Sequence, residues 1–176
     1  FINRWCILTP GEKTNATAIA TATAFWEGLG SKVEVMSPLQ HDFVVAITSH
    51  LPHLAAFSIF HTALKYEDKL GSEVTKFSAG GFRDFTRIAS SNPSMWRDIF
   101  LANKDQMLEV LREFVQDMEA FSAAIEREDG EAIADLVSKS RLTRRRVIEK
   151  EHISLQPKPD ELKSKRSLPR PYASDL

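Results

Sequence analysis

The sequence lacks several features that would assign it to a specialised class of protein. It contains a single cysteine, Cys6, among 176 residues, so it forms no internal disulfide and is typical of a reducing compartment. Its 23 basic and 24 acidic residues give a net charge of −1, which argues against binding to nucleic acid or to an acidic membrane. No uninterrupted apolar run reaches the roughly 18 residues of a membrane helix. No secretory signal opens the chain. We therefore expect a cytoplasmic protein with no membrane partner.

The motifs of common cofactor sites are missing as well. Residues 1–176 contain no G-x-G-x-x-G after a strand and no P-loop, and they contain neither G-x-S-x-G nor H-E-x-x-H. A metal site at His50 and His53 would need a third ligand. The nearest candidates, His61 and the pair Glu67-Asp68, lie about two helical turns or more away. We therefore expect no resident metal.

The first 36 residues are typical of a strand, a helix and a second strand. Residues 5–8 are a short apolar run closed by a Thr-Pro-Gly turn, which predicts a buried strand. Thr14 or Asn15 can cap the following helix, and Gly30 suits the left-handed residue at its end. Residues 33–36 predict the second strand. This pattern is typical of the end of an α/β unit, and because the chain opens on a strand already in progress, we expect it to begin inside a larger protein.

From residue 37 onward the pattern is helical. Ser37 is a good N-cap, and Pro38 suits the first helical position. The apolar period continues toward His50. Pro52 then interrupts it, because proline has no N–H to donate, so we expect the helix to kink or restart there. Helical periodicity resumes over residues 53–70.

Three more helices are predicted in the rest of the chain. Asn92-Pro93 begins a short one, and Asn103 caps a longer one whose apolar residues between 111 and 125 recur at steps of three and four. A last helix follows Gly130. From residue 156 the chain becomes rich in Pro, Lys and Ser and loses periodicity, which predicts an extended tail.

These patterns predict a mainly α fold. Residues 1–36 form the end of an α/β domain, residues 37–155 an all-helical domain, and residues 156–176 the tail. The hydrophobic content of 43% suffices for a core. The helical domain carries long apolar seams without a full shell of its own, so we expect it to pair with a copy of itself.

The segment from Thr48 to His53 is the first candidate site. Four polar side chains crowd the turn that the proline disturbs, and His50 and His53 are three residues apart, so they share a face if the helix continues. Such a pair could bind a ligand or titrate near neutral pH. The alternative is two histidines that are simply satisfied at a helix junction.

The segment from Ser78 to Arg87 is the second candidate. Gly80 and Gly81 indicate a turn or a close approach of backbone to another group. Arg87 can grip both oxygens of a carboxylate, and Asp84 can orient it. The alternative is a surface ion pair after a glycine turn.

Two further features have weaker functional interpretations. Trp96 is either core or the wall of a flat ligand site. The cluster of arginines at 141 and 144–146 complements a helix C-terminus or binds an anion.

Five segments carry a family resemblance. They are Thr9-Pro10, Ser37-Pro38 with His41-Asp42, Ser49-His50-Leu51-Pro52-His53, Gly80-Gly81-Phe82-Arg83-Asp84-Phe85-Thr86-Arg87, and Asn92-Pro93 with Trp96-Arg97-Asp98. In this order they resemble the prephenate/arogenate dehydrogenase family, also called cyclohexadienyl dehydrogenases. The resemblance covers most of residues 5–128.

The resemblance implies a larger enzyme. Family members carry an N-terminal Rossmann domain that binds NAD or NADP, so residues 1–36 would be its C-terminal remnant, and residues 37–155 would be the dimerisation and substrate domain. Members oxidise and decarboxylate prephenate or arogenate on the route to tyrosine. The implied partners are this substrate and a second copy of the chain.

The resemblance also implies roles for individual residues. Arg87 would grip the ring carboxylate, and His53 would contact the substrate side chain. Ser49 and His50 would line the cleft near the nicotinamide. Asp84 would sit at the cofactor junction, while Gly80, Gly81 and Trp96 would close the pocket.

The chain departs from the family in one respect. The glycine-rich loop and the segment with the family's catalytic histidine are missing, so we expect the general base to lie outside residues 1–176. The alternative to an enzyme is a non-catalytic dimeric helical module that binds an acidic metabolite.

Overall fold

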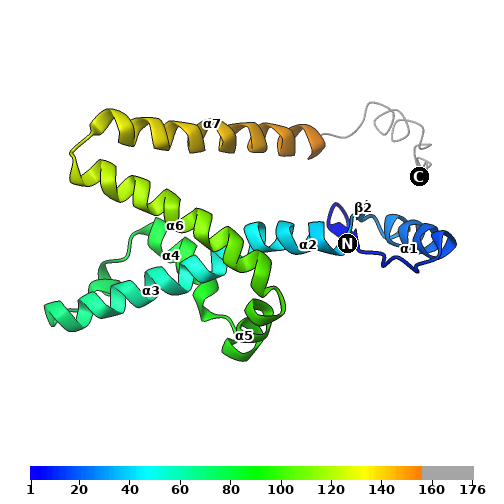
Figure 1. Cartoon of the computed structure of the whole chain (residues 1–176), viewed down its shortest axis with the longest axis horizontal. Coiled ribbons are helices and arrows are strands. Elements are labelled where there is room, and N and C mark those ends of the chain that lie inside the picture. Colours follow the sequence, from blue (N-terminus) through cyan, green and yellow to red (C-terminus); the bar gives the residue numbers. More distant parts are fainter. Residues whose placement is uncertain (156–176) are drawn as a thin grey trace, which may run out of the picture. The chain divides into compact units, whose positions relative to one another are not determined.

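The computed structural model describes the backbone of residues 1–155 and the side chains of residues 1–148. The expected tail at 156–176 lies outside the described residues. Contacts divide the chain into two compact units, Phe1–Gln116 and Asp117–Leu176. The boundary between them falls inside the long helix α6, Lys104–Glu126 (Figure 1). Most of the described chain is helical, which confirms the predicted fold class.

The chain opens with the expected strand, helix and strand. β1, Trp5–Leu8, and β2, Lys32–Val35, pair in parallel, with Cys6 opposite Val33. The connecting helix is α1, Ala16–Gly28, and the carboxamide oxygen of its N-cap, Asn15, accepts a hydrogen bond from the Thr17 amide at 2.7 Å.

Gly30 follows this helix with a φ of +88°, as its position at a helix end predicted. A Cβ at Gly30 would also come within 3.1 Å of the Ile2 side chain. Only glycine meets both requirements, so this turn fixes where β2 begins.

The central helix of the first unit differs from the expectation in an informative way. α2, Pro38–Val45, starts where predicted, because the Ser37 hydroxyl accepts a hydrogen bond from the Gln40 amide at 3.2 Å. It passes through a π-helical turn, η1, Ala46–His50, into α3, Leu51–Leu70. The Leu51 amide reaches back five residues to the Ala46 carbonyl. The helix therefore neither stops nor restarts at Pro52. It widens by one residue in the turn before the proline, and such a widened turn accommodates the interruption that proline makes in the ladder of helix hydrogen bonds.

This continuous helix is also apolar over much of its length. Over Pro38–Leu70, 33 residues, it contains an 18-residue window of mean hydropathy 1.6, so by length and composition alone it could cross a membrane. A count of uninterrupted apolar runs misses it, because residues such as Ser49 and His50 are interleaved with apolar ones. Within its unit, α3 packs against η2, η3 and α4.

The rest of the first unit surrounds α3. Gly71 ends that helix with a φ of +56°. α5 is capped by Asn92, whose side-chain oxygen accepts a hydrogen bond from the Met95 amide at 3.1 Å, as predicted. The segments that follow Gly71 are η2 (Val74–Phe77), α4 (Gly80–Thr86), η3 (Arg87–Ser90) and α5 (Pro93–Ala102).

The second unit contains the end of α6 and the helix α7, Gly130–Leu155. Glu128 turns the chain with a φ of +53°. The Asp129 carboxylate then accepts a hydrogen bond from the Ala132 amide at 3.0 Å, which caps α7.

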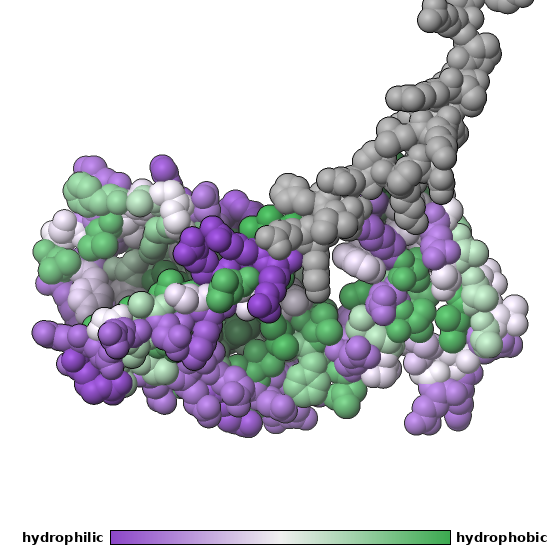
Figure 2. Space-filling model, turned by 90° about the horizontal axis from the view of Figure 1, so that it is seen from above, coloured by the Kyte–Doolittle hydropathy of each residue, from purple (hydrophilic) through white to green (hydrophobic). Residues whose placement is uncertain are grey.

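The core of the described chain is small. Its fully buried apolar residues are few, and many large apolar side chains are open to solvent, as Figure 2 shows for one face. Helices α6 and α7 alone expose Leu108, Val115, Met118, Ile125, Val137, Leu142, Val147 and Ile148. Exposed apolar surface on this scale is typical of a chain that has further partners.

Ala56 provides a test of the packing around α3. Its Cβ is fully buried, with 0% of the residue exposed. We expect Ala56→Leu to lower the free energy of unfolding by about 1–3 kcal/mol, because the added methyl groups have no space to occupy. The midpoint of urea unfolding measures this. Ala20→Leu, at an exposed position of α1, is the matched control and should change the midpoint little. Equal effects of the two variants would contradict close packing at Ala56.

Candidate functional site

Trp96 on α5 is the centre of the candidate site. It is only 5% exposed. The His53 ring stacks on its indole, with centroids 3.8 Å apart and planes 26° apart, and the His50 ring meets it edge-on at 6.1 Å. The ring centroids of Phe57 and Phe100 lie 6.2 Å and 5.4 Å from the centroid of the Trp96 ring. The two histidines therefore do share a face, because the widened turn keeps the helix continuous across Pro52.

The Asn103 side chain belongs to this cluster, although its position before a helix predicted that it would cap that helix. Its side-chain nitrogen donates a hydrogen bond to the Asp42 carbonyl at 2.8 Å and lies 3.3 Å from Nδ1 of His50. Its side-chain oxygen is buried and has no partner among the described residues. The prediction that this side chain caps α6 was therefore wrong. The Asn103 carbonyl does accept the first hydrogen bond of that helix, from the Met107 amide, so the residue marks the helix start correctly.

The charge of His50 is controlled by its surroundings. Burial lowers the pKa of His50 below its usual value, and the nearby His41 and His53 lower it further, while the charge of Asp42 opposes them. Asp42 itself accepts a hydrogen bond from His41, with 3.0 Å between Nδ1 and Oδ1. His50 is therefore set to be neutral near neutral pH.

A hollow of about 300 Å³ opens beside this network. Both the Ser49 and His50 side chains line it, and both are half-buried. The other lining residues are His41, Asp42, Val45, Ile99, Ala102 and Asn103. A second hollow of about 450 Å³ is lined by Phe57, His61, Ala89, Ser91, Pro93, Trp96, Arg97 and Phe100. The first offers the denser set of polar groups, and the second an aromatic wall with one arginine.

The segment that begins at Ser78 is a helix rather than a glycine turn. Gly80 and Gly81 start α4, neither has a positive φ, and a Cβ on either would meet no atom within 4 Å. The expectation of a special turn was therefore wrong, whereas a close approach of this backbone to a ligand stays a prediction. Both glycines are exposed, so the space beside them is open.

The charged residues of this segment are also exposed. Arg87 and Asp84 form no ion pair within 4 Å among the described residues, so the expected orienting contact is absent. Phe85 is exposed, and Phe82 is half-buried, 6.0 Å from the Phe60 ring. Among the described residues, the Arg87 side chain forms no hydrogen bond or ion pair with a histidine.

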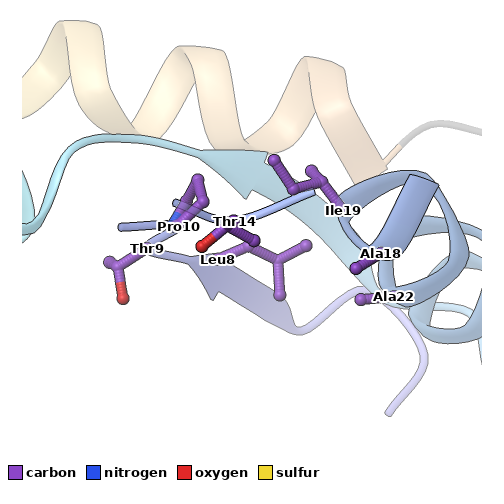
Figure 3. A pocket seen from close by; sticks show the side chains of 7 residues that line it. All are labelled: Leu8, Thr9, Pro10, Thr14, Ala18, Ile19 and Ala22. Atoms are coloured by element: carbon purple, nitrogen blue, oxygen red, sulfur yellow. The ribbon is translucent and has the colours of Figure 1, made fainter. Parts of the chain in front are cut away.

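A third hollow of about 260 Å³ lies between β1 and α1. Figure 3 shows Leu8 at its centre, with Ala18 and Ala22 contributed by α1. Thr9, Pro10, Thr14 and Ile19 complete the lining. It is predominantly apolar and offers two threonine hydroxyls. Among the described residues, no group of three or more His, Cys, Asp or Glu is arranged to hold a metal.

Comparison with known proteins gives this arrangement a family. The sequence model described as "Prephenate dehydrogenase, dimerization domain" matches residues 37–139. The chain belongs to the prephenate dehydrogenase family. The match covers the widened helix, the Trp96 cluster and Arg87, which confirms the resemblance found in the sequence.

Individual relatives agree. Cyclohexadienyl dehydrogenase of Zymomonas mobilis is 40% identical over 138 residues, which are 78% of this chain and 47% of that protein. Prephenate dehydrogenase of Bacillus subtilis is 42% identical over 131 residues, which are 74% of this chain and 35% of that protein. The crystal structure of prephenate dehydrogenase from A. aeolicus with hydroxyphenyl propionate and NAD+ matches with a TM-score of 0.76 and 36% identity, covering 81% of this chain and 50% of that one. The chain thus spans half or less of the length of these relatives, which are oxidoreductases.

The depressed pKa of His50 predicts a pH dependence of stability. The unfolded chain binds a proton near the ordinary histidine pKa of about 6.5, whereas the folded chain binds it only at lower pH. Stability is therefore lost as the pH falls from about 6.5 through the folded pKa. We expect His50→Gln to reduce the difference between the urea midpoints at about pH 7.5 and pH 5. His61→Gln, at an exposed position of α3, is the control; an equal reduction in both variants would exclude His50 as the cause.

Proposed function

We propose that this chain is the substrate-binding and dimerisation part of a prephenate or arogenate dehydrogenase. The whole enzyme would carry out an NAD(P)-dependent oxidative decarboxylation in tyrosine biosynthesis, in the cytoplasm. The observation that carries the proposal is the cluster at the widened helix turn, where two histidines, an asparagine and a tryptophan meet beside a hollow within the family's matched region. The match to a dehydrogenase whose structure holds hydroxyphenyl propionate and NAD+ supports the same class of ligand.

Each part of the proposed site has a physical task. Arg87 grips the ring carboxylate, since its exposed guanidinium has no ion-pair partner among the described residues. His53 contacts the substrate side chain, and its stacking on Trp96 fixes the plane of its ring. Gly80 and Gly81 leave open space for the substrate. Trp96 closes the pocket with an apolar wall, and the residue could serve its own subunit or a partner.

The cofactor would meet this chain at one end only. Ser49 and His50 line one hollow and would face the nicotinamide, with Asp84 at the junction. The described residues offer no glycine-rich phosphate loop, so they fit the nicotinamide end and not the pyrophosphate. When bound, NAD or NADP accepts the hydride. A neutral His50 beside it avoids repelling the positive charge of the oxidised ring.

The apolar surface supports a homodimer. The exposed apolar residues of α6 and α7 would be covered by a second copy, and the family name describes a dimerization domain. Obligate dimers bury apolar surface of this kind.

Arg87→Ala in the full-length enzyme tests the proposed anchor. We expect the KM for prephenate to rise roughly 30- to 1,000-fold with little change for the cofactor, because a bidentate charged contact is worth on the order of 2–4 kcal/mol. Steady-state kinetics with each substrate varied measures this. Arg112→Ala, an exposed arginine of α6, is the control. An unchanged KM for prephenate would remove Arg87 from the role.

A second experiment distinguishes the dehydrogenase from the alternative, a non-catalytic dimeric module that binds an acidic metabolite. We expect residues 1–176 alone to bind NAD weakly and to show no turnover of prephenate, because the proposed general base lies outside them. A version extended upstream through a G-x-G-x-x-G strand–helix unit should be active. Robust turnover by residues 1–176 would refute the division of labour. An upstream domain of another kind would favour the binding module.

A further inference from the structure

The orientation of the Asn103 amide can be deduced from its partner. The Asp42 atom 2.8 Å away is a backbone carbonyl oxygen, which can only accept. The side-chain atom of Asn103 that faces it must therefore be the nitrogen. The backbone of Asn103 is held at both sides, since its amide donates to the Ile99 carbonyl at 3.1 Å and its carbonyl accepts from the Met107 amide at 3.0 Å.

This orientation determines which nitrogen of His50 carries the proton. The Asn103 nitrogen has two protons, and one of them is directed to Asp42. The nitrogen also lies 3.3 Å from Nδ1 of His50, so Nδ1 must be the acceptor there. A neutral imidazole with a bare Nδ1 carries its proton on Nε2. His50 is thereby a donor through Nε2.

His53 is held in the opposite state. Its Nδ1 lies 2.9 Å from the backbone carbonyl of Ser49, which can only accept, so Nδ1 carries the proton. In the neutral ring Nε2 is then bare and accepts. The two histidines differ because one faces a donor amide and the other faces a carbonyl.

We propose that Asn103 is a positioning residue that holds His50 as the neutral Nε2–H tautomer, so that His50, which lines the hollow beside Asn103, serves a ligand as a hydrogen-bond donor through Nε2. An oxygen atom of the ligand matches this donor, because a hydroxyl, carbonyl or carboxylate oxygen can accept a hydrogen bond from Nε2. The identity of the ligand rests on the function proposed above, whereas the tautomers do not.

Asn103 also disfavours a charged His50. Protonation of Nδ1 would place an N–H against the amide N–H of Asn103, two donors facing each other. Four helices contribute groups around the His50 ring. They are His41 and Asp42 from α2, His53 from α3, Trp96 from α5 and Asn103 at the start of α6. Only Asp42 favours the charged form, and burial opposes it.

Nitrogen NMR of the full-length protein, labelled with ¹⁵N at histidine, tests the tautomers directly. Protonated and bare ring nitrogens have well-separated shifts, and the five histidines are assigned by single substitutions. We expect the wild-type protein near pH 7 to show a bare Nδ1 and a protonated Nε2 at His50, and the reverse at His53. A proton on Nδ1 of His50 would overturn the proposal, and this result needs no variant to fold.

Asn103→Asp tests the positioning role. The carboxylate accepts instead of donating, so we expect the His50 proton to move to Nδ1 and its pKa to rise by about 1–3 units, with His53 unchanged. Asn103→Leu, which removes the donor without adding a charge, should give a mixture of His50 tautomers. Asn92→Asp, at the exposed cap of α5, is the matched control and should leave both histidines as they are. An unchanged His50 in both Asn103 variants would overturn the role.

The kinetics separate the two proposals. In an active enzyme, Asn103→Asp should shift the pH profile of kcat/KM toward higher pH in step with the NMR titration of His50. If the NMR result holds and the full-length protein has no dehydrogenase activity, the proposed function fails while the tautomer assignment stands.

Discussion

The geometry of the site depends on a single chemical fact, which is that Pro52 has no amide proton. An α-helix that reaches a proline must give up a hydrogen bond or change its period. Here the helix takes one extra residue into the turn at Ala46–His50 before the proline, and it continues at full length to Leu70. The wider turn rotates α3 about the helix axis relative to α2. Ser49 and His50 line the hollow as a result, and His53 falls on the same side as His50.

Trp96 brings the residues of the widened helix turn into contact with α5. It reaches α3 from α5 and contacts both histidine rings, while Phe57 and Phe100 fill the remaining faces. Aromatic pairs of this kind contribute roughly 0.5–1.5 kcal/mol each beyond the burial of their area. The same contacts therefore join two helices and fix the planes of two titratable rings. Ala46, Ala55 and Ala56 of the same continuous helix are buried as well.

Local chemistry explains why some elements could be predicted from the sequence. Asn15, Ser37 and Asn92 each cap a helix as expected, because a cap satisfies amides of its own first turn and needs no distant partner. Asn103 has the same signature, but its side chain is drawn to Asp42 and His50, which lie 61 and 53 residues away. No pattern in a single sequence shows such a contact. The turn predicted at residues 80 and 81 is instead the start of α4, because glycine is compatible with several backbone conformations, the helical one included.

Asn103 shows why the exception is informative. Using its side chain as a cap would satisfy the oxygen, whereas the observed arrangement leaves that oxygen buried without a protein partner, at a cost of about 1–3 kcal/mol. The residue instead directs its amide protons to the Asp42 carbonyl and to Nδ1 of His50, and the second contact favours the ring whose Nδ1 is bare. Burial lowers the pKa of His50, and the Asn103 amide faces its Nδ1, so both the surroundings and this contact favour a neutral histidine beside the hollow.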